Sequence, residues 1–108
     1  INGFSSFYFD LVYYKQVGRM VHVWYDIYGV SDLDVFEITG LIYANERLPS
    51  MGTALGIVDN GYTYSSPGYC QIYASTTLTV TIDSNTDLWT SSGDKGARGY
   101  ICYEMWPS

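Results

Sequence analysis

Aromatic side chains and short hydrogen-bonding groups gather in one stretch near the middle of the chain. Tyr62, Tyr64 and Tyr69 stand close to Asn60 and to a pair of serines. The C–H faces of sugar rings stack on aromatic rings, and their hydroxyls exchange hydrogen bonds with Asn, Ser and Asp. This combination predicts a carbohydrate-binding site in which the three tyrosines contact the ligand.

Trp89 forms a second group of the same kind with Asp87, Thr90 and Ser91. The alternative for the tyrosines is structural, because tyrosines in hairpins often cover the edge of a core. If the groups are functional, the ligand contacts are the aromatic residues Tyr62, Tyr64, Tyr69 and Trp89.

Residues arranged for catalysis are missing from the sequence, which has no G-x-S-x-G motif, no Gly-rich phosphate loop and no zinc-type spacing of Cys and His. The single histidine, His22, alternates with Val21 and Val23, which predicts a hydrogen-bonded structural residue within a strand. Asp32 and Asp34 resemble a carboxylate pair, but neighbouring acids at the start of a strand are usually solvated. We therefore expect a binding domain and not an enzyme.

Four oxygen-bearing side chains, those of Asp83, Asn85, Asp87 and Asp94, have a spacing similar to that of an EF-hand calcium loop. Leu88 occupies the sixth position, where such a loop needs Gly, and the flanking segments look like strands and not helices. A polar turn is the preferred interpretation, and we expect neither a metal ion nor a cofactor.

The charge of the chain restricts its partners. Its 108 residues carry a net charge of −6 and only five lysines and arginines. Nucleic acids and anionic membrane surfaces are held by clustered Lys and Arg, so both are excluded as expected partners. No apolar run approaches the roughly 20 residues that span a bilayer. A neutral or cationic ligand suits the acidic excess, although such charge also serves solubility.

The two cysteines, Cys70 and Cys102, lie in separate strand-like segments and can pair only if those strands are neighbours. Small secreted scaffolds that depend on disulfides usually carry four or more cysteines. We expect both thiols to be reduced, buried and packed as small hydrophobic groups.

Alternating apolar residues predict the strands that would position these groups. The chain has no helical pattern, and its length suits one core. We expect an all-β fold, an antiparallel β-sandwich of jelly-roll type with seven to eight short strands, formed as a single domain over residues 1–108. The expected strands are 4–16, 19–28, 33–39, 53–58, 68–74, 77–83 and 100–106, with a long connection at 40–52, turns at 17–18 and 59–61, and a polar stretch at 84–99.

Some of these strands are apolar on both faces. Met20, Trp24 and Tyr28 alternate with a fully apolar set in the second strand, and Tyr100 and Trp106 do the same in the last. The outer face of an antiparallel sheet should be polar, so this second face needs a cover. Another protomer in a closed homotrimer would supply one. The alternative is that the long 40–52 connection covers the face within one chain.

Three short motifs resemble a known family. Residues 13–23, YYKQVGRMVHV, resemble the Tyr-x-x-x-Gly-Arg/Lys-x-Val opening of small β-domains at the C-terminal ends of bacteriophage tail fibres, tailspikes and baseplate receptor-binding proteins. Residues 36–41, FEITGL, look like the following strand, which ends in Gly-Leu, although Ile42 stands where the family often has Pro. Residues 99–103, GYICY, are similar to the closing strand.

This resemblance implies a homotrimer at the distal tip of a virion tail fibre, assembled in the bacterial host cytoplasm, that binds a host-cell surface glycan or protein. No binding residue of the family transfers from motifs this short. The chain, which opens at Ile1, is then expected to be the C-terminal fragment of a longer protein. The alternatives are a monomeric carbohydrate-binding module of a bacterial enzyme and a purely structural trimerisation cap, and the parent reading frame would distinguish a fibre from an enzyme.

Overall fold

A computed structural model describes residues 1–41, 50–72, 76–82 and 89–104, which contain eight β-strands and no helix. Every strand pairing in this part of the chain is antiparallel, so the predicted all-β, antiparallel fold is confirmed. The strands are β1 (Phe4–Val17), β2 (Met20–Ser31), β3 (Glu37–Ile38), β4 (Ser50–Asp59), β5 (Tyr62–Thr63), β6 (Gly68–Ile72), β7 (Leu78–Thr81) and β8 (Asp94–Glu104).

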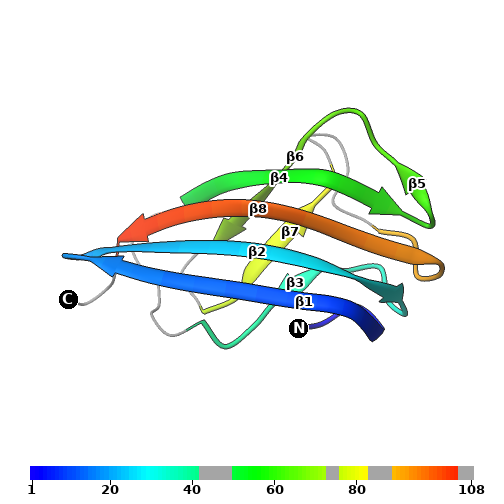
Figure 1. Cartoon of the computed structure of the whole chain (residues 1–108), viewed down its shortest axis with the longest axis horizontal. Helices are drawn as coiled ribbons and strands as arrows, with labels where there is room; N and C mark the ends of the chain where they lie inside the picture. Colours follow the sequence, from blue (N-terminus) through cyan, green and yellow to red (C-terminus); the bar gives the residue numbers. More distant parts are fainter. Residues whose placement is uncertain (42–49, 73–75, 83–88, 105–108) are drawn as a thin grey trace.

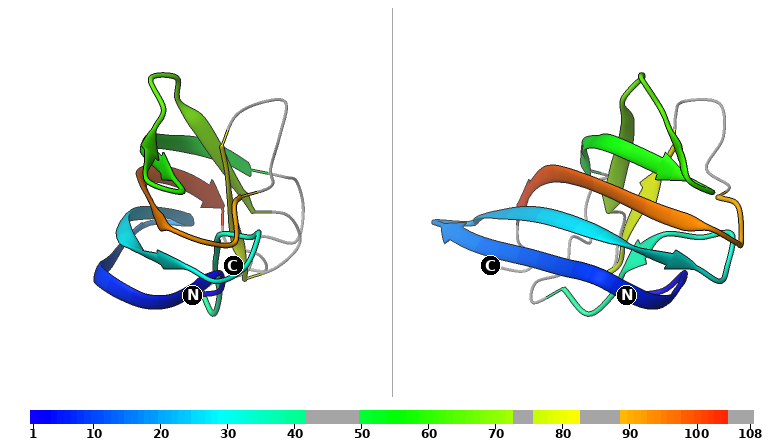
Figure 2. Two further views of the ribbon diagram at one scale, coloured as in Figure 1. Left: turned by 90° about the vertical axis from the view of Figure 1, so that its right-hand side faces the viewer. Right: turned by 45° about the vertical axis from the view of Figure 1, so that its right-hand side comes forward.

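The strands form one curled sheet in the order β1-β2-β8-β4-β6-β7-β3, with β5 attached to β4. β1, β2, β8 and β4 lie side by side as one layer, and β6, β7 and β3 cross behind them (Figures 1 and 2). Asn2, just before β1, exchanges backbone hydrogen bonds of 2.9 and 3.2 Å with Glu37 of β3, so the two ends of the sheet come together. These layers are compatible with the predicted sandwich, and the jelly-roll connection stays a prediction.

The core lies between the two layers. In β2 the side chains of Val21, Val23, Tyr25 and Ile27 all point inward and are at most 2% exposed, as their alternation predicts. The opposite layer and the neighbouring strand complete the core with Ile72, Leu78, Val80, Ile82, Ile101 and Tyr103.

Two tight turns join neighbouring strands where the sequence predicts them. Gly18, with φ of 61°, begins the turn between β1 and β2, and Asn60 and Gly61, with φ of 50° and 76°, make the turn between β4 and β5. Positive φ at these positions suits Gly and Asn. Both hairpins therefore have the local sequence that their turns require.

Strand β1 turns most of its apolar residues away from the core, which the sequence pattern does not predict. It pairs only with β2 in the described chain, and irregularities in the register lie between Phe4 and Ser6 and between Phe7 and Phe9. The alternating residues that predict one apolar face for this strand are exposed and do not form core: Phe7, Phe9, Leu11 and Tyr13. The last three of them stand opposite the outward side chains of β2. Of the β1 residues, the partly buried Phe4 and Val12 pack against the core.

The last strand also begins earlier than expected. β8 starts at Asp94, inside the stretch 84–99 that the sequence analysis assigns to polar, irregular structure. The third expected strand, 33–39, shortens to the two residues of β3. Residues 42–49, most of the expected long connection, and residues 83–88 lie outside the described residues.

Candidate functional site

The outward face of β2 and β8 brings together aromatic and charged side chains from distant parts of the chain. Alternate positions of β2 turn Trp24, Asp26 and Tyr28 outward, away from the core positions between them. The antiparallel register places Trp24 opposite Tyr100 and Asp26 opposite Arg98. Residues more than seventy positions apart therefore share one surface.

One end of this surface is an aromatic cluster. The ring centroids of Trp24 and Tyr100 are 5.2 Å apart, and the imidazole of His22 stacks beside both rings at 5.9 and 5.8 Å. Nδ1 of His22 lies 2.6 Å from the hydroxyl oxygen of Tyr100. His22 is thus hydrogen-bonded within a strand, as predicted, and it orients the Tyr100 ring. Trp24 keeps 41% of its surface exposed.

A pocket of about 340 Å³ adjoins the aromatic cluster. Trp24 of β2, Tyr100 and Arg98 of β8, and Thr53 and Leu55 of β4 are among the residues that line it. Small-molecule sites usually combine apolar walls with a few convergent polar groups, and this pocket has that character.

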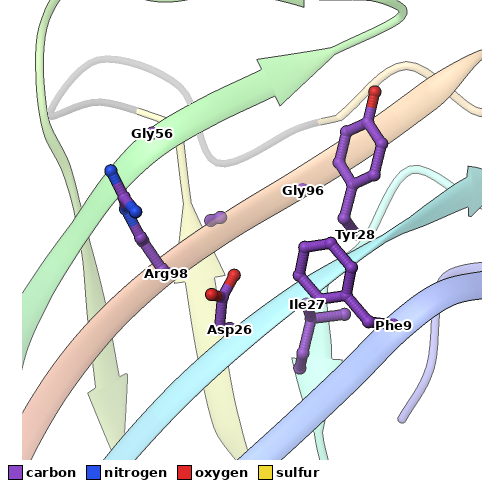
Figure 3. Close-up of a pocket in the computed structure, with 8 residues that line it drawn as sticks. Phe9, Asp26, Ile27, Tyr28, Gly56, Gly96 and Arg98 are labelled. Atoms are coloured by element: carbon purple, nitrogen blue, oxygen red, sulfur yellow. The ribbon is translucent and has the colours of Figure 1, made fainter.

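A second pocket, of about 230 Å³, lies on the other side of the same charged pair. Asp26 and Arg98 line both pockets, and Phe9 and Tyr28 belong to the second. Figure 3 shows Arg98 and Asp26 on neighbouring strands, with the rings of Tyr28 and Phe9 beyond them. The two pockets form one shallow depression, which we call the outer groove.

Glycines form the floor of the outer groove. A Cβ atom at Gly96 would lie 2.5 Å from Cδ2 of Tyr28, so the Tyr28 ring can lie flat across β8 only because that side chain is missing. At Gly56, with φ of +59°, a Cβ would lie 3.5 Å from Nε of Arg98, which is an ordinary van der Waals distance. The position of the Tyr28 ring at this end of the groove thus depends on Gly96.

The hydroxyls at the far end of the groove are fixed by Asp94. Tyr8 and Tyr28 donate hydrogen bonds of 3.1 and 3.3 Å to the two oxygens of this carboxylate, and their rings lie 5.1 Å apart. The hydrogen bond to Asp94 raises the pKa of Tyr8, and burial followed by the charge of Asp94 raises the pKa of Tyr28. Both hydroxyls are therefore protonated at neutral pH and hold the rings in place.

All four sequence-predicted ligand contacts lie outside the outer groove, three of them on or near β5 and β6. Tyr62 on β5 is 67% exposed, and its ring meets that of the half-buried Tyr64 edge-on at 5.1 Å. Tyr69 lies half-buried on β6, beside Thr53 of β4. Tyr62 and Tyr64 form a small aromatic surface of their own at the β4–β5 hairpin, and Tyr64 packs against the core.

The prediction that Trp89 is the fourth ligand contact is wrong, because its side chain is buried. Its side chain is 3% exposed, Nε1 donates a 2.9 Å hydrogen bond to the Val80 carbonyl, and its ring lies 5.2 Å from that of Phe36. The backbone N–H and the hydroxyl of Thr90, the next residue, donate hydrogen bonds of 2.9 Å to the carboxylate of Asp59. Trp89 is therefore part of the core.

The outer groove cannot be found from the sequence alone, although several of its residues can. Alternation places Trp24, Tyr28 and Tyr100 on a second face of their strands, where the sequence predicts a subunit contact. It does not connect the charged residues Asp26 and Arg98 with them. The missing information was the pairing of β2 with β8, which local sequence does not reveal.

The thiols are unpaired, as expected, because β4 separates β6 from β8. Cys70 is buried, and burial raises its pKa to about 11. Cys102 is half-buried, with Sγ 4.0 Å from Nε2 of His22, so the expectation of full burial is met by Cys70 alone.

Asp32 and Asp34 are exposed. The described residues contain no group of three or more His, Cys, Asp or Glu side chains able to hold a metal ion. Most of the EF-hand-like stretch, Asp83 to Leu88, lies outside the described residues.

Within the described part of the chain there is no helix with the length and apolar character needed to cross a membrane.

Comparison with protein-family models, with curated proteins and with solved structures finds no significant match to this chain.

Proposed function

We propose that this chain is a carbohydrate-binding domain that recognises a host-cell surface glycan through the outer groove. In keeping with the motifs that resemble phage fibre tips, we place it at the distal end of a virion tail fibre, as a homotrimer and without enzymatic activity. The outer groove replaces the loop tyrosines as the main ligand contact in this proposal.

The observation that carries the proposal is the pair of adjacent aromatic rings that line one pocket, the exposed Trp24 and the half-buried Tyr100, next to the charged side chains of Asp26 and Arg98. Aromatic faces stack on the C–H faces of a sugar ring. A carboxylate accepts hydrogen bonds from sugar hydroxyls, and a guanidinium donates to them. Such a set binds a polyhydroxylated ring on both its apolar face and its polar rim.

The hydrogen bonding around the groove supports a role in recognition because the aromatic side chains are held in place before a ligand arrives. His22 holds Tyr100, and Asp94 holds Tyr28. Rigid aromatic residues bind at a low cost in conformational entropy.

The proposed trimer would be formed by the part of β1 that follows Tyr8 and Phe9, since these two residues belong to the outer groove. Tyr13 and Val17, further along this strand, are 58% and 55% exposed. A long apolar strand at a sheet edge is normally covered, and a neighbouring protomer would provide the cover. This surface is the specific observation that also favours the second candidate, a domain that only trimerises the fibre.

A glycan array of bacterial surface polysaccharides, followed by calorimetry on any hit, tests the proposed function. Trp24→Ala should weaken binding at least tenfold, about 1.4 kcal/mol, because it removes the stacking surface. Tyr62→Ala is the matched control, since Tyr62 is also an exposed aromatic residue on a strand but lies outside the groove.

Circular dichroism must show that both variants keep the β-sheet fold. Loss of binding in Tyr62→Ala with full binding in Trp24→Ala would move the site to the β4–β5 hairpin. A blank array for the native domain would favour the trimerisation cap.

A further inference from the structure

The outer groove is longer than a single sugar ring. Its two pockets share Asp26 and Arg98, so they adjoin each other along β2 and β8. Trp24 and Tyr28 mark its two ends and are four residues apart on one strand, which corresponds to roughly 13 Å at the rise of an extended strand. A ligand that fills the groove must therefore be extended along the strands.

The chemistry of the groove repeats along this direction in the order aromatic, charged, aromatic. Trp24 and Tyr100 form the first position, Asp26 and Arg98 the middle one, and Tyr28, with Phe9 at 6.0 Å between ring centroids, the last. Because the hydroxyl of Tyr28 already donates to Asp94, this last position offers mainly its ring face. Each position suits one unit of a linear glycan.

The charges along the groove favour a neutral sugar over an acidic one. Arg98 is the cation that lines both pockets. Its backbone pairs with that of Asp26, which lines both pockets as well, while Asp94 lies at the far end beside Tyr28. A sugar carboxylate in the middle position would meet Asp26 as well as Arg98, and towards the far end it would approach Asp94. Like charges at close range oppose binding, so an acidic unit gains little here.

Resting on the proposed function, we infer that the ligand of the outer groove is a linear, neutral oligosaccharide of about three units that runs parallel to β2 and β8. One ring stacks on Trp24 and Tyr100, the next spans Asp26 and Arg98, and the third lies against Tyr28. Binding energy is distributed over the length of the groove.

Calorimetry with linear oligosaccharides of increasing length tests this inference. The probes are β-1,4-linked glucose, β-1,4-linked N-acetylglucosamine and β-1,4-linked mannose, each from one to six units, and the neutral fragments of any polysaccharide that binds on the array. Affinity should rise at least tenfold from one unit to three and then level off, because further units extend beyond the groove.

Two variants assign the ends of the groove. Tyr28→Ala should reduce trisaccharide affinity to the level of the disaccharide and leave monosaccharide affinity unchanged. Trp24→Ala should weaken every length of ligand. Tyr62→Ala, outside the groove, should change neither the affinities nor their dependence on length.

The charge preference is tested with a uronic-acid trisaccharide of the same linkage. The native domain should bind the acidic trisaccharide at least tenfold more weakly than the neutral trisaccharide. The Asp26→Asn variant should bind the two trisaccharides with more similar affinities. Affinity that is independent of length, or a preference for the acidic trisaccharide, would contradict the inference while leaving carbohydrate binding intact. If neither the oligosaccharides nor the array gives binding, the inference and the proposed function both fail.

Discussion

Lys95 is a fully buried lysine on β8, close to the end of the sheet where the chain begins. Its Nζ donates hydrogen bonds of 3.1 and 2.6 Å to the carbonyls of Leu33 and Val35 and lies 4.7 Å from the centroid of the Phe4 ring. Nearby aromatic rings and carbonyl oxygens replace part of the water that an ammonium group loses on burial. Lys95 thereby connects β8 to the segment that leads into β3 and to the start of β1.

Burial lowers the pKa of Lys95 from 10.5 to about 8, and the negative charges of Asp32, Asp59 and Asp34 oppose this shift. Between these two values the unfolded chain binds more protons than the folded chain. The stability contributed by Lys95 is therefore lowest below pH 8 and increases as the pH rises towards 10.5.

This direction of the pH dependence gives a prediction for the Lys95→Met variant. The free energy of unfolding of the native chain, minus that of the variant, should increase by roughly 1–3 kcal/mol between pH 7 and pH 10. Urea denaturation at both pH values measures it, and the ionisation of tyrosines cancels in the difference. A difference in unfolding free energy that stays constant or falls would show that Lys95 of the folded chain keeps its proton between pH 7 and pH 10.

At the scale of the strands, β2 could be predicted from sequence and the first half of β8 could not. β2 alternates a strictly apolar set with a mixed one, and that period identifies both the strand and its inner face. In β8 the inward positions before Ile101 are Lys95, Ala97 and Gly99, so the strand begins without large apolar residues. The buried lysine is the residue that a sequence pattern assigns to solvent.

The groove escaped prediction for a related reason. The outward positions of β2 are visible in the sequence, but their partners on β8 are more than seventy residues away and the pairing depends on the whole sheet. Trp89 is predicted as a ligand contact because polar residues surround it in the sequence. In the fold its indole crosses the interior to reach the Val80 carbonyl.

Gly99 shows how closely β8 packs against the core side of the sheet. The hydroxyl of Tyr25 donates a 2.9 Å hydrogen bond to the Thr53 carbonyl on β4, and it passes beneath Gly99 on β8 to do so. A Cβ at Gly99 would collide with that carbonyl oxygen and lie 2.5 Å from Oη of Tyr25. Because Gly99 has no side chain, the hydrogen bond from Tyr25 of β2 to Thr53 of β4 can cross beneath β8, the strand between them.

We expect Gly99→Ala to lower the free energy of unfolding by about 3 kcal/mol, because the added methyl must displace Tyr25 or separate β8 from β4. Gly18→Ala is the control, since no atom lies within 4 Å of the added Cβ and only its φ of 61° opposes the change. That control should cost about 1 kcal/mol. Urea denaturation compares them, and equal losses would show that β8 tolerates the methyl group.

At the scale of the whole molecule, the distribution of apolar surface is uneven. The exposed large hydrophobic residues concentrate on β1 and on the adjoining outward face, while the core between the layers is closed. Single soluble chains rarely expose apolar patches of such extent without a partner. A ligand in the outer groove would cover the exposed apolar surface near Trp24 and Tyr28. The exposed apolar surface of β1 needs a different partner.

The proposed homotrimer places β1 at the contact between protomers, and light scattering coupled to size exclusion tests it. At micromolar concentration the native domain should have about three times the 12.2 kDa mass of one chain. The double substitution Tyr13→Lys and Val17→Lys should reduce the mass to one chain, because lysines on an edge strand oppose its pairing and the burial of its faces. Tyr62→Lys, at another exposed tyrosine, on β5, should leave the assembly intact. A native mass near 12.2 kDa would contradict the trimer, and a double variant that stays trimeric would exclude β1 as its contact.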